Sequence, residues 1–352
     1  MSFRNLSPQV MYEQMALALE PRFRFKATDK TGFEAWKQEA LPAVLKCLGD
    51  FPARVPLNPQ RLASFEHDGL VKEKWLIDVG PFISATLLIN RPVDLDLSRR
   101  HPAIMCWHGH GIHGKEPVMG NDGSPEMRTA IKDHNYHYGH VMAKAGFVTY
   151  AIDWLGCGER NDDRKPNWRG SAKGNRDWCN IYYLHATMLG MTSISVNATH
   201  GMAATDFIST QPYVDPQRLG VMGLSGGGTT TLWSTICDAR FKASEIICYS
   251  DLWAHFGIRD LNYCGMQVAP GLFKLVDLPE AQGLICPRPL LIDIGAYDSC
   301  FKIDTAMVCY QKVRQIYDAA GAGDKLELDL FPSEHAWGGN LSVPFFRKHL
   351  GH

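Results

Sequence analysis

Short runs rich in hydrophobic residues recur along the chain after residue 100. They span 103–107, 147–152, 219–224, 243–249, 289–294 and 326–331. Between several of these runs the apolar residues have helical spacing, and 192–210 is predicted to be an amphipathic helix. Buried strands that alternate with helices are typical of a mainly parallel sheet with helices on both faces. The pattern predicts an α/β fold, in which ligands bind beyond the carboxyl ends of the strands.

The first part of the chain has a different pattern. Segments 8–19 and 31–48 carry apolar residues at helical spacing, and the proline-rich segment 51–58 follows as a connector. Neither a second hydrophobic core nor a clear linker is visible in the sequence. We therefore expect residues 1–60 to form a helical extension packed on one domain of residues 61–352.

Two strands are predicted where this domain begins. Segments 70–77 and 82–89 are separated by Gly80 and Pro81, which indicate a tight turn. The two strands are therefore expected to pair antiparallel at an edge of the sheet. Further along, a helix is predicted over 136–145.

Composition and charge exclude several classes of protein. Hydrophobic residues make up 45% of the 352 residues, whereas a disordered chain is poor in them. The 36 Lys and Arg residues nearly balance the 37 Asp and Glu residues, so the basic excess typical of nucleic-acid-binding proteins is absent. The net charge of -1 is compatible with a homo-oligomer.

Other sequence features bear on the cellular compartment. No stretch of about 18 residues is continuously apolar, so we expect no membrane-spanning helix. Residues 1–20 lack a basic segment followed by an apolar one, so no signal peptide is expected. The 10 cysteines include no Cys-x-x-Cys pair, which favours reduced thiols over a disulfide framework. Together these features predict a cytoplasmic protein.

A glycine-rich turn follows the hydrophobic run that ends at residue 224. Residues 223–227 read Gly-Leu-Ser-Gly-Gly, and helical spacing resumes at 229–236. A G-x-S-x-G sequence between a strand and a helix is the pattern of a nucleophile elbow, in which small neighbours allow a strained turn that exposes the serine hydroxyl. Ser225 is therefore the predicted nucleophile. The alternative is a turn that binds phosphate or only packs.

A serine nucleophile needs a base, and in this topology an acid and then a histidine follow it along the chain. His335 comes just after the last hydrophobic run, whereas His349 lies in a basic C-terminal helix that is typical of a surface. Asp298 directly follows the preceding run, and Asp251 is the alternative acid. We predict His335 as the base and Asp298 as the carboxylate that orients it.

A loop of sequence His-Gly-His-Gly at 108–111 follows the first hydrophobic run. A tetrahedral intermediate needs two backbone N–H donors, one from the residue after the nucleophile and one from such a loop. Gly226 is the first predicted donor to this oxyanion hole. The amide of His110 is the second, with Gly111 as the neighbouring alternative.

Histidines gather in and near this loop, at positions 108, 110, 113, 134, 137 and 140. Clustered imidazoles can hold zinc. However, a metal site usually adds cysteine or carboxylate ligands at set spacing, and the sequence lacks His-Glu-x-x-His. We expect no metal and no cofactor, and a metal-dependent enzyme is kept as an alternative.

Three further stretches carry a resemblance to a known family. Residues 213–220 have the sequence Tyr-Val-Asp-Pro-x-Arg-x-Gly, and 286–291 have Cys-Pro-Arg-Pro-Leu-Leu ahead of Gly-x-x-Asp at 295–298. Residues 153–160 read Asp-Trp-Leu-Gly-Cys-Gly-Glu-Arg, and their charged side chains are expected to hold a loop by ion pairing. Over about residues 60–350 the chain resembles α/β-hydrolases of the dienelactone hydrolase and acetylxylan-esterase-like group.

This resemblance implies an α/β-hydrolase fold and ester chemistry. It also implies Ser225, Asp298 and His335 as a catalytic triad, with the amides of His110 and Gly226 as oxyanion donors. The chain departs from dienelactone hydrolases proper, which have a cysteine where this sequence has Ser225.

Two segments are predicted to line the substrate pocket. Trp168, Arg169 and Trp178 lie in a loop that follows a predicted strand, and Tyr263 lies in the segment 260–283. Trp and Arg can hold a sugar face or a carboxylate. Ordinary surface packing explains each of these residues as well.

These features predict a serine hydrolase that cleaves a carboxylic ester through an acyl-enzyme. The expected substrate is a small molecule with a small acyl or acetyl group, such as a carbohydrate ester. Lactone hydrolases, thioesterases and peptidases use the same triad and remain alternatives. A non-catalytic binding protein on the same scaffold is a further alternative.

Overall fold

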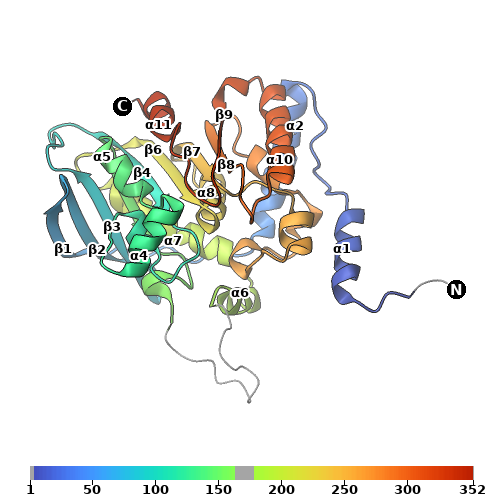
Figure 1. Ribbon diagram of the computed structural model, residues 1–352, viewed down its shortest axis with the longest axis horizontal. Helices are drawn as coiled ribbons and strands as arrows, with labels where there is room; N and C mark the ends of the chain where they lie inside the picture. Colours follow the sequence, from blue (N-terminus) through green and yellow to red (C-terminus); the bar gives the residue numbers. More distant parts are fainter. Residues whose placement is uncertain (1–3, 163–177, 352) are drawn as a thin grey trace, which may run out of the picture.

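Nine strands form one sheet that runs through the centre of the molecule, with helices on both faces (Figure 1). The computed structural model describes residues 4–162 and 178–351. Along the sheet the strands lie in the order β1-β2-β3-β5-β4-β6-β7-β8-β9. Their bounds are β1 Gln60–His67, β2 Leu70–Gly80, β3 Ile83–Pro92, β4 His101–Trp107, β5 Val148–Ile152, β6 Val214–Leu224, β7 Phe241–Ile247, β8 Leu290–Gly295 and β9 Leu326–Phe331.

The sheet is parallel over most of its width. Strands β4 to β9 are parallel wherever they pair, whereas β1, β2 and β3 pair antiparallel and β3 also meets β5 antiparallel. The antiparallel edge has one strand more than the sequence pattern predicts. The pattern misses β1 because this strand has no buried side chain. The predicted α/β fold with a mainly parallel sheet is confirmed.

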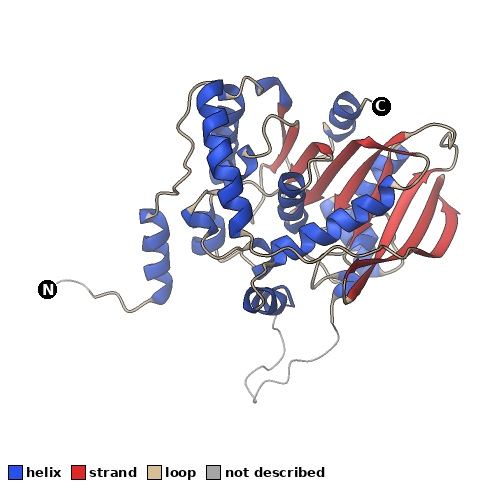
Figure 2. Ribbon diagram, turned by 180° about the vertical axis from the view of Figure 1, so that it is seen from behind, coloured by secondary structure: helices blue, strands red, loops and turns tan. Residues whose placement is uncertain are grey.

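Helices cover the two faces of the sheet in separate groups (Figure 2). On one face α2, α8, α9 and α10 pack against β7 and β8, and α7 packs against β2 to β6. On the opposite face α5 and α11 pack on β3, β4 and β6. The helix bounds are α1 Pro8–Ala18, α2 Lys30–Cys47, α3 Lys115–Val118, α4 Pro125–His134, α5 Tyr138–Lys144, α6 Trp178–Met188, α7 Ser193–Ser209, α8 Gly226–Cys237, α9 Leu278–Gly283, α10 Ile303–Ala319 and α11 Ser342–Leu350.

Helix α7 differs from its prediction. The spacing predicts an amphipathic helix, yet nearly every side chain of α7 is buried, including polar ones. The helix lies between the sheet and two other helices, α6 and α8. Small residues allow this close packing, since a Cβ at Gly201 would lie only 2.7 Å from Trp107 Cζ2. Small and polar side chains therefore fill positions that the sequence pattern assigns to solvent.

Helix α4 is absent from the sequence-based prediction. It is mostly polar and none of its side chains is fully buried, so its apolar positions are few and easily overlooked. Its start is marked by Ser124, whose hydroxyl accepts a hydrogen bond from Met127 N at 3.1 Å. It ends at Asn135, which has the left-handed φ of +48°.

The two N-terminal helices have different environments. Helix α2 buries Phe33, Ala40 and Val44 in the same hydrophobic cluster as α10. Helix α1 lies at one end of the molecule and exposes most of its apolar side chains (Figure 1). Among the described residues no helix is both long and apolar enough to cross a bilayer. None of the 10 cysteines takes part in a disulfide bond.

The carboxyl ends of four strands meet at one edge of the sheet. The loop 108–111 follows β4 and Ser225 follows β6, while Asp298 and His335 lie in the segments after β8 and β9. Parallel strands direct all of these segments to the same side of the molecule. The fold therefore brings together residues that are far apart in the sequence.

The turn from β6 into α8 requires a glycine at 227. A Cβ at this position would overlap the carbonyl oxygen of Trp107 and lie 2.9 Å from that of His108. We expect Gly227→Ala to lower the free energy of unfolding by about 1–3 kcal/mol, because these backbone atoms cannot rotate away. Urea denaturation measures this loss. Gly123→Ala is the control, since a Cβ there meets no atom within 4 Å, and equal stability of the two variants would contradict this explanation.

Candidate active site

Ser225 occupies a strained turn between β6 and α8. Its φ of +60° and ψ of -118° lie outside the regions that residues with a Cβ normally adopt. The amide of Ser225 donates a hydrogen bond to Ile247 O at 2.9 Å, which ties the turn to β7. Helix α8 begins directly at Gly226, three residues earlier than the spacing predicts. The positive end of the helix dipole therefore lies beside the serine.

Asp298 and His335 form a hydrogen-bonded pair. His335 Nδ1 lies 2.7 Å from Asp298 Oδ2, while Asp298 Oδ1 accepts hydrogen bonds from Cys300 N and Phe301 N at 2.7 and 3.0 Å. Burial opposes the charged form of Asp298, but the hydrogen bond and charge of His335 and the two amides hold its pKa below the ordinary value. The ring of Phe301 stacks on that of His335 with centroids 5.7 Å apart. The hydrogen bond to Asp298 and the stacking on Phe301 together orient the imidazole of His335.

The loop that carries His335 is held by the end of α4. His134 Nδ1 donates to His335 O at 2.7 Å, and Trp337 N donates to His134 O at 3.0 Å. The side-chain amide of Asn135 adds a bond to Trp337 O at 3.0 Å. Thus His134, one of the clustered histidines, positions the backbone on both sides of Ala336.

The buried carboxyl group of Glu245 also anchors the loop that carries His335. The indole of Trp337 donates to Glu245 Oε1 on β7 at 3.0 Å, and the hydroxyl of Ser342 donates to the same oxygen at 2.6 Å. Burial raises the pKa of Glu245 to about 7, although both hydrogen bonds act in the opposite direction. The segment after β9 is therefore fixed to β7 as well as to α4.

The alternative acid and base lie in other surroundings. Asp251 accepts hydrogen bonds from Thr305 Oγ1 at 2.8 Å and Leu252 N at 2.6 Å, and burial raises its pKa to about 6. His349 lies on α11, where its Nε2 is 3.5 Å from Glu327 Oε1. Of the two predicted acids, Asp298 is the one hydrogen-bonded to His335.

Gly226 and His110, the two predicted oxyanion donors, lie close together. A Cβ at Gly226 would lie 3.1 Å from His110 Nδ1, so the loop after β4 touches the start of α8. The amide of the preceding residue, Gly109, donates to the hydroxyl of Tyr136. This bond fixes the loop just before His110.

His108 has a structural position beneath this loop. Its Nδ1 donates to Gly109 O at 2.7 Å, and its Nε2 accepts from Trp154 N at 3.2 Å. Burial lowers the pKa of His108 to about 4, although Asp153 at 3.4 Å acts in the opposite direction. The ring is therefore neutral and stacks on Trp154, with centroids 5.3 Å apart. It joins the ends of β4 and β5.

The charged residues after β5 hold their loop by ion pairing, as expected for Asp153 and Glu159. Lys115 Nζ lies 2.6 Å from Asp153 Oδ2 and 2.8 Å from Glu159 Oε2, and Lys74 Nζ lies 2.6 Å from Glu159 Oε1. Arg160 differs, because it donates to the backbone oxygen of Asp153 at 3.0 Å.

A cavity of about 370 Å³ lies over the site and is lined by both Ser225 and His335. Its other lining residues are Gly109, His110, Gly111, Ile112, His113, Gly114, Pro117, Ala130, His134, Tyr136, Leu224, Phe256, Asn262, Gln267, Cys300 and Phe301. None of these described residues is Lys, Arg, Asp or Glu. His113 Nε2 and Gln267 Oε1 are buried and have no hydrogen-bond partner within the described ranges.

The four residues predicted to bind substrate have different positions. Trp168 and Arg169 lie outside the described residues. Trp178 is the first residue of α6 and stacks on Tyr182, with centroids 5.2 Å apart. Tyr263 lines a separate cavity of about 470 Å³ beside α1.

Some cavity residues lie in a segment predicted to line the pocket and others were missed in the sequence. Asn262 and Gln267 belong to the predicted segment 260–283, whereas Phe256, after β7, and Cys300 and Phe301, shortly after Asp298, were not predicted. Their positions after the carboxyl ends of β7 and β8 are the signal that could have identified them.

Two groups of side chains within the described residues have the composition of a metal site. One consists of Cys248, Asp298 and His335. In this group the Asp298–His335 hydrogen bond is already made, and Cys248 Sγ donates to Ala336 O at 3.3 Å. Burial raises the pKa of Cys248 well above its ordinary value. The other two members are the predicted acid and base, and their hydrogen bond to each other accounts for their closeness.

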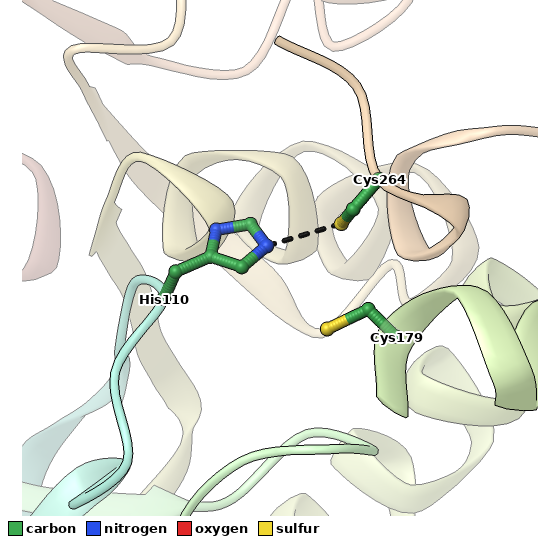
Figure 3. A group of neighbouring side chains, drawn as sticks. All are labelled: His110, Cys179 and Cys264. Carbon is green, nitrogen blue, oxygen red and sulfur yellow. Dashed lines mark hydrogen bonds between the residues drawn. The ribbon is translucent and has the colours of Figure 1, made fainter. Parts of the chain in front are cut away.

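The other group consists of His110, Cys179 and Cys264 (Figure 3). His110 Nε2 lies 3.0 Å from Cys264 Sγ, with Cys179 on the adjacent helix. The hydrogen bond between the two thiols lowers the pKa of Cys264, which His110 also lowers, and raises the pKa of Cys179. No spacing in the sequence signals this group, since its three members come from distant segments.

The chain is similar to several known proteins in sequence and in structure. The chain is 24% identical over 294 residues to a Bacillus subtilis protein named "Putative hydrolase YtaP", covering 82% of this chain and 90% of that protein. A Bacteroides fragilis structure described as a putative acetyl xylan esterase has a TM-score of 0.77 at 20% identity and covers 98% and 95% of the two chains. A glucuronoyl esterase from Solibacter usitatus has a TM-score of 0.66 at 15% identity, covering 95% and 99%.

These structural similarities support the α/β-hydrolase fold that the sequence predicts. The model of the Abhydrolase family matches residues 2–333, which include the serine turn and all strands of the sheet from β1 to β9. The resemblance to α/β-hydrolases is thereby confirmed, and the chain belongs to the Abhydrolase family.

Proposed function

We propose that this protein is a serine hydrolase that cleaves neutral carboxylic esters with a small acyl or acetyl group. The observation that carries the proposal is the cavity shared by Ser225, on its strained turn, and His335, hydrogen-bonded to Asp298. A nucleophile, a base and an orienting carboxylate are the groups that acyl transfer requires.

In the proposed reaction His335 takes the proton of Ser225 as the hydroxyl oxygen attacks the ester carbonyl. The negative charge that forms on the carbonyl oxygen is stabilised by the amides of His110 and Gly226 and by the N-terminus of α8. Asp298 stabilises the imidazolium, which then protonates the departing alcohol. Water, activated by the same imidazole, attacks the acyl-enzyme and releases the acid and Ser225.

The lining of the cavity supports a neutral, polar substrate. Among its described lining residues no carboxylate or Lys or Arg cation is present to pair with a charged group. His113 Nε2 and Gln267 Oε1 lack partners within the described part of the chain and can bond substrate hydroxyl groups. Tyr136 and Phe256 add aromatic side chains to the lining, which are compatible with a sugar ring. An acetylated carbohydrate, the substrate class named for one structural relative, fits this lining.

Replacing Ser225 tests its assignment as the nucleophile. We expect Ser225→Ala to lower kcat for p-nitrophenyl acetate by roughly 10⁴–10⁶-fold, because no acyl-enzyme can form. Steady-state assays on p-nitrophenyl esters, acetylated sugars and lactones measure this loss, and a fluorophosphonate probe should label only the wild type. Thermal unfolding checks that the variant is folded. Comparable turnover or labelling in the two proteins would refute the assignment of Ser225.

Two substitutions distinguish the candidate acids Asp298 and Asp251. Asp298→Asn should lower kcat on the order of 10⁴-fold, because the amide cannot stabilise the imidazolium. Asp251→Asn is the matched control and should change kcat far less, since Asp251 contacts Thr305 and Leu252. Kinetics of both variants on one ester test this, and a larger loss in Asp251→Asn would reverse the assignment.

The third prediction concerns pH. The pKa of Asp298 is held below its ordinary value, so this carboxylate stays ionised and can stabilise an imidazolium. A histidine base must be neutral to accept a proton, and histidine side chains in general change charge between about pH 5 and pH 8, so kcat/KM should rise over this range. A pH-rate profile of an unactivated acetyl ester measures the rise. A flat profile over this range would argue against His335 as the base.

A further inference from the structure

Three ligand atoms that suit a soft divalent cation converge next to the proposed oxyanion loop. They are His110 Nε2, Cys179 Sγ and Cys264 Sγ, and all lie within 4.8 Å of one another. The three residues come from the loop after β4, the first turn of α6 and the segment before a short helix, Gly265–Gln267. In Figure 3 the imidazole points toward Cys264, and Cys179 faces the same space from the helix.

The fold holds the two cysteines together by contacts between their neighbours. Gly265 N, next to Cys264, donates to the side-chain oxygen of Asn180, next to Cys179, at 2.7 Å. The two segments are in direct contact, since a Cβ at Gly265 would overlap the side chain of Tyr183. Contacts between α6 and the segment that carries Cys264 therefore set the relative position of the two thiols.

The third ligand is oriented independently. The ring of His110 packs edge-on against Trp154, with centroids 4.9 Å apart and an interplanar angle of 83°. This contact directs Nε2 to Cys264 at 3.0 Å, while Nδ1 lies on the side of Gly226. A preformed set of ligands lowers the cost of ordering a metal site.

The spacing of these atoms fits a tetrahedral ion. With Zn–S near 2.3 Å and Zn–N near 2.0–2.1 Å, tetrahedral ligand atoms lie about 3.5–3.8 Å apart, so shifts of about 1 Å or less would suffice. Two thiolates and one imidazole are donors that zinc prefers over magnesium or calcium. From this geometry we propose that His110, Cys179 and Cys264 form a zinc-binding site that shares a residue with the oxyanion loop.

Binding of Zn²⁺ at this site replaces the protons of the cysteine thiols, which pass to solvent, and leaves one coordination position for water. The ion would link α6 to the loop 108–111 through His110. This proposal departs from the expectation of no metal, which considered histidines close in sequence and missed cysteines brought in by the fold. The zinc site does not depend on ester hydrolysis, because metal binding is measured without turnover.

The test uses the full-length, reduced protein and Zn²⁺ alone, titrated in competition with a chromophoric chelator. We expect about one high-affinity Zn²⁺ per chain in the wild type, and loss of this binding in a Cys179→Ser/Cys264→Ser double variant. The matched control is Cys47→Ser/Cys237→Ser, which removes two half-buried thiols outside both candidate metal groups and should bind like the wild type.

Titration of the wild type with Co²⁺ provides a readout that does not depend on a variant folding. We expect a thiolate-to-cobalt charge-transfer band and the intense visible bands of a tetrahedral ion, both removed by excess Zn²⁺. Absence of these bands, or equal Zn²⁺ binding in the wild type and the Cys179/Cys264 double variant, overturns the proposal. So does a Cys179–Cys264 disulfide in the isolated protein whose reduction produces no Zn²⁺ binding.

Discussion

The strained turn at Ser225 is the constraint on which the rest of the site depends. A non-glycine residue stays at a φ of +60° only where the surrounding structure leaves it no alternative. Here the alternatives are removed by β6 on one side, by α8 starting at once on the other, and by the Ser225 N to Ile247 O hydrogen bond. Gly227 permits this packing because its missing Cβ leaves room for the carbonyl oxygens of Trp107 and His108.

The same constraint extends to the loops around the serine. His108 and Trp154 stack at the ends of β4 and β5, so the loop that reaches Gly226 has a fixed base. On the other side Glu245 and the end of α4 hold the segment after β9, which presents His335. Hydrogen bonds of buried polar groups position both loops, since breaking such a bond in a buried setting costs stability. Rigid surroundings of this kind are what electrostatic stabilisation of an oxyanion requires.

Much of the fold and part of the site could be predicted from the sequence. Continuous apolar runs identified β4 to β9 because strands buried on both faces must be hydrophobic throughout. The chain order of serine, acid and histidine predicted Ser225, Asp298 and His335 as a triad, and the structure brings the last two into hydrogen-bond contact. The exposed strand β1, the polar helix α4 and the buried helix α7 were missed or misread, because their composition does not reflect their environment.

The sequence alone determined the local requirements: where strands and helices form, and which turn must carry a serine between small residues. It could not determine which distant side chains meet, because that depends on how loops fold over the sheet edge. The sequence favoured Asp298 over Asp251, but only the tertiary structure showed that Asp298 is the one hydrogen-bonded to His335, and it placed Phe256 in the cavity. It also brought His110 to Cys179 and Cys264 through the packing of α6, which no spacing in the chain encodes.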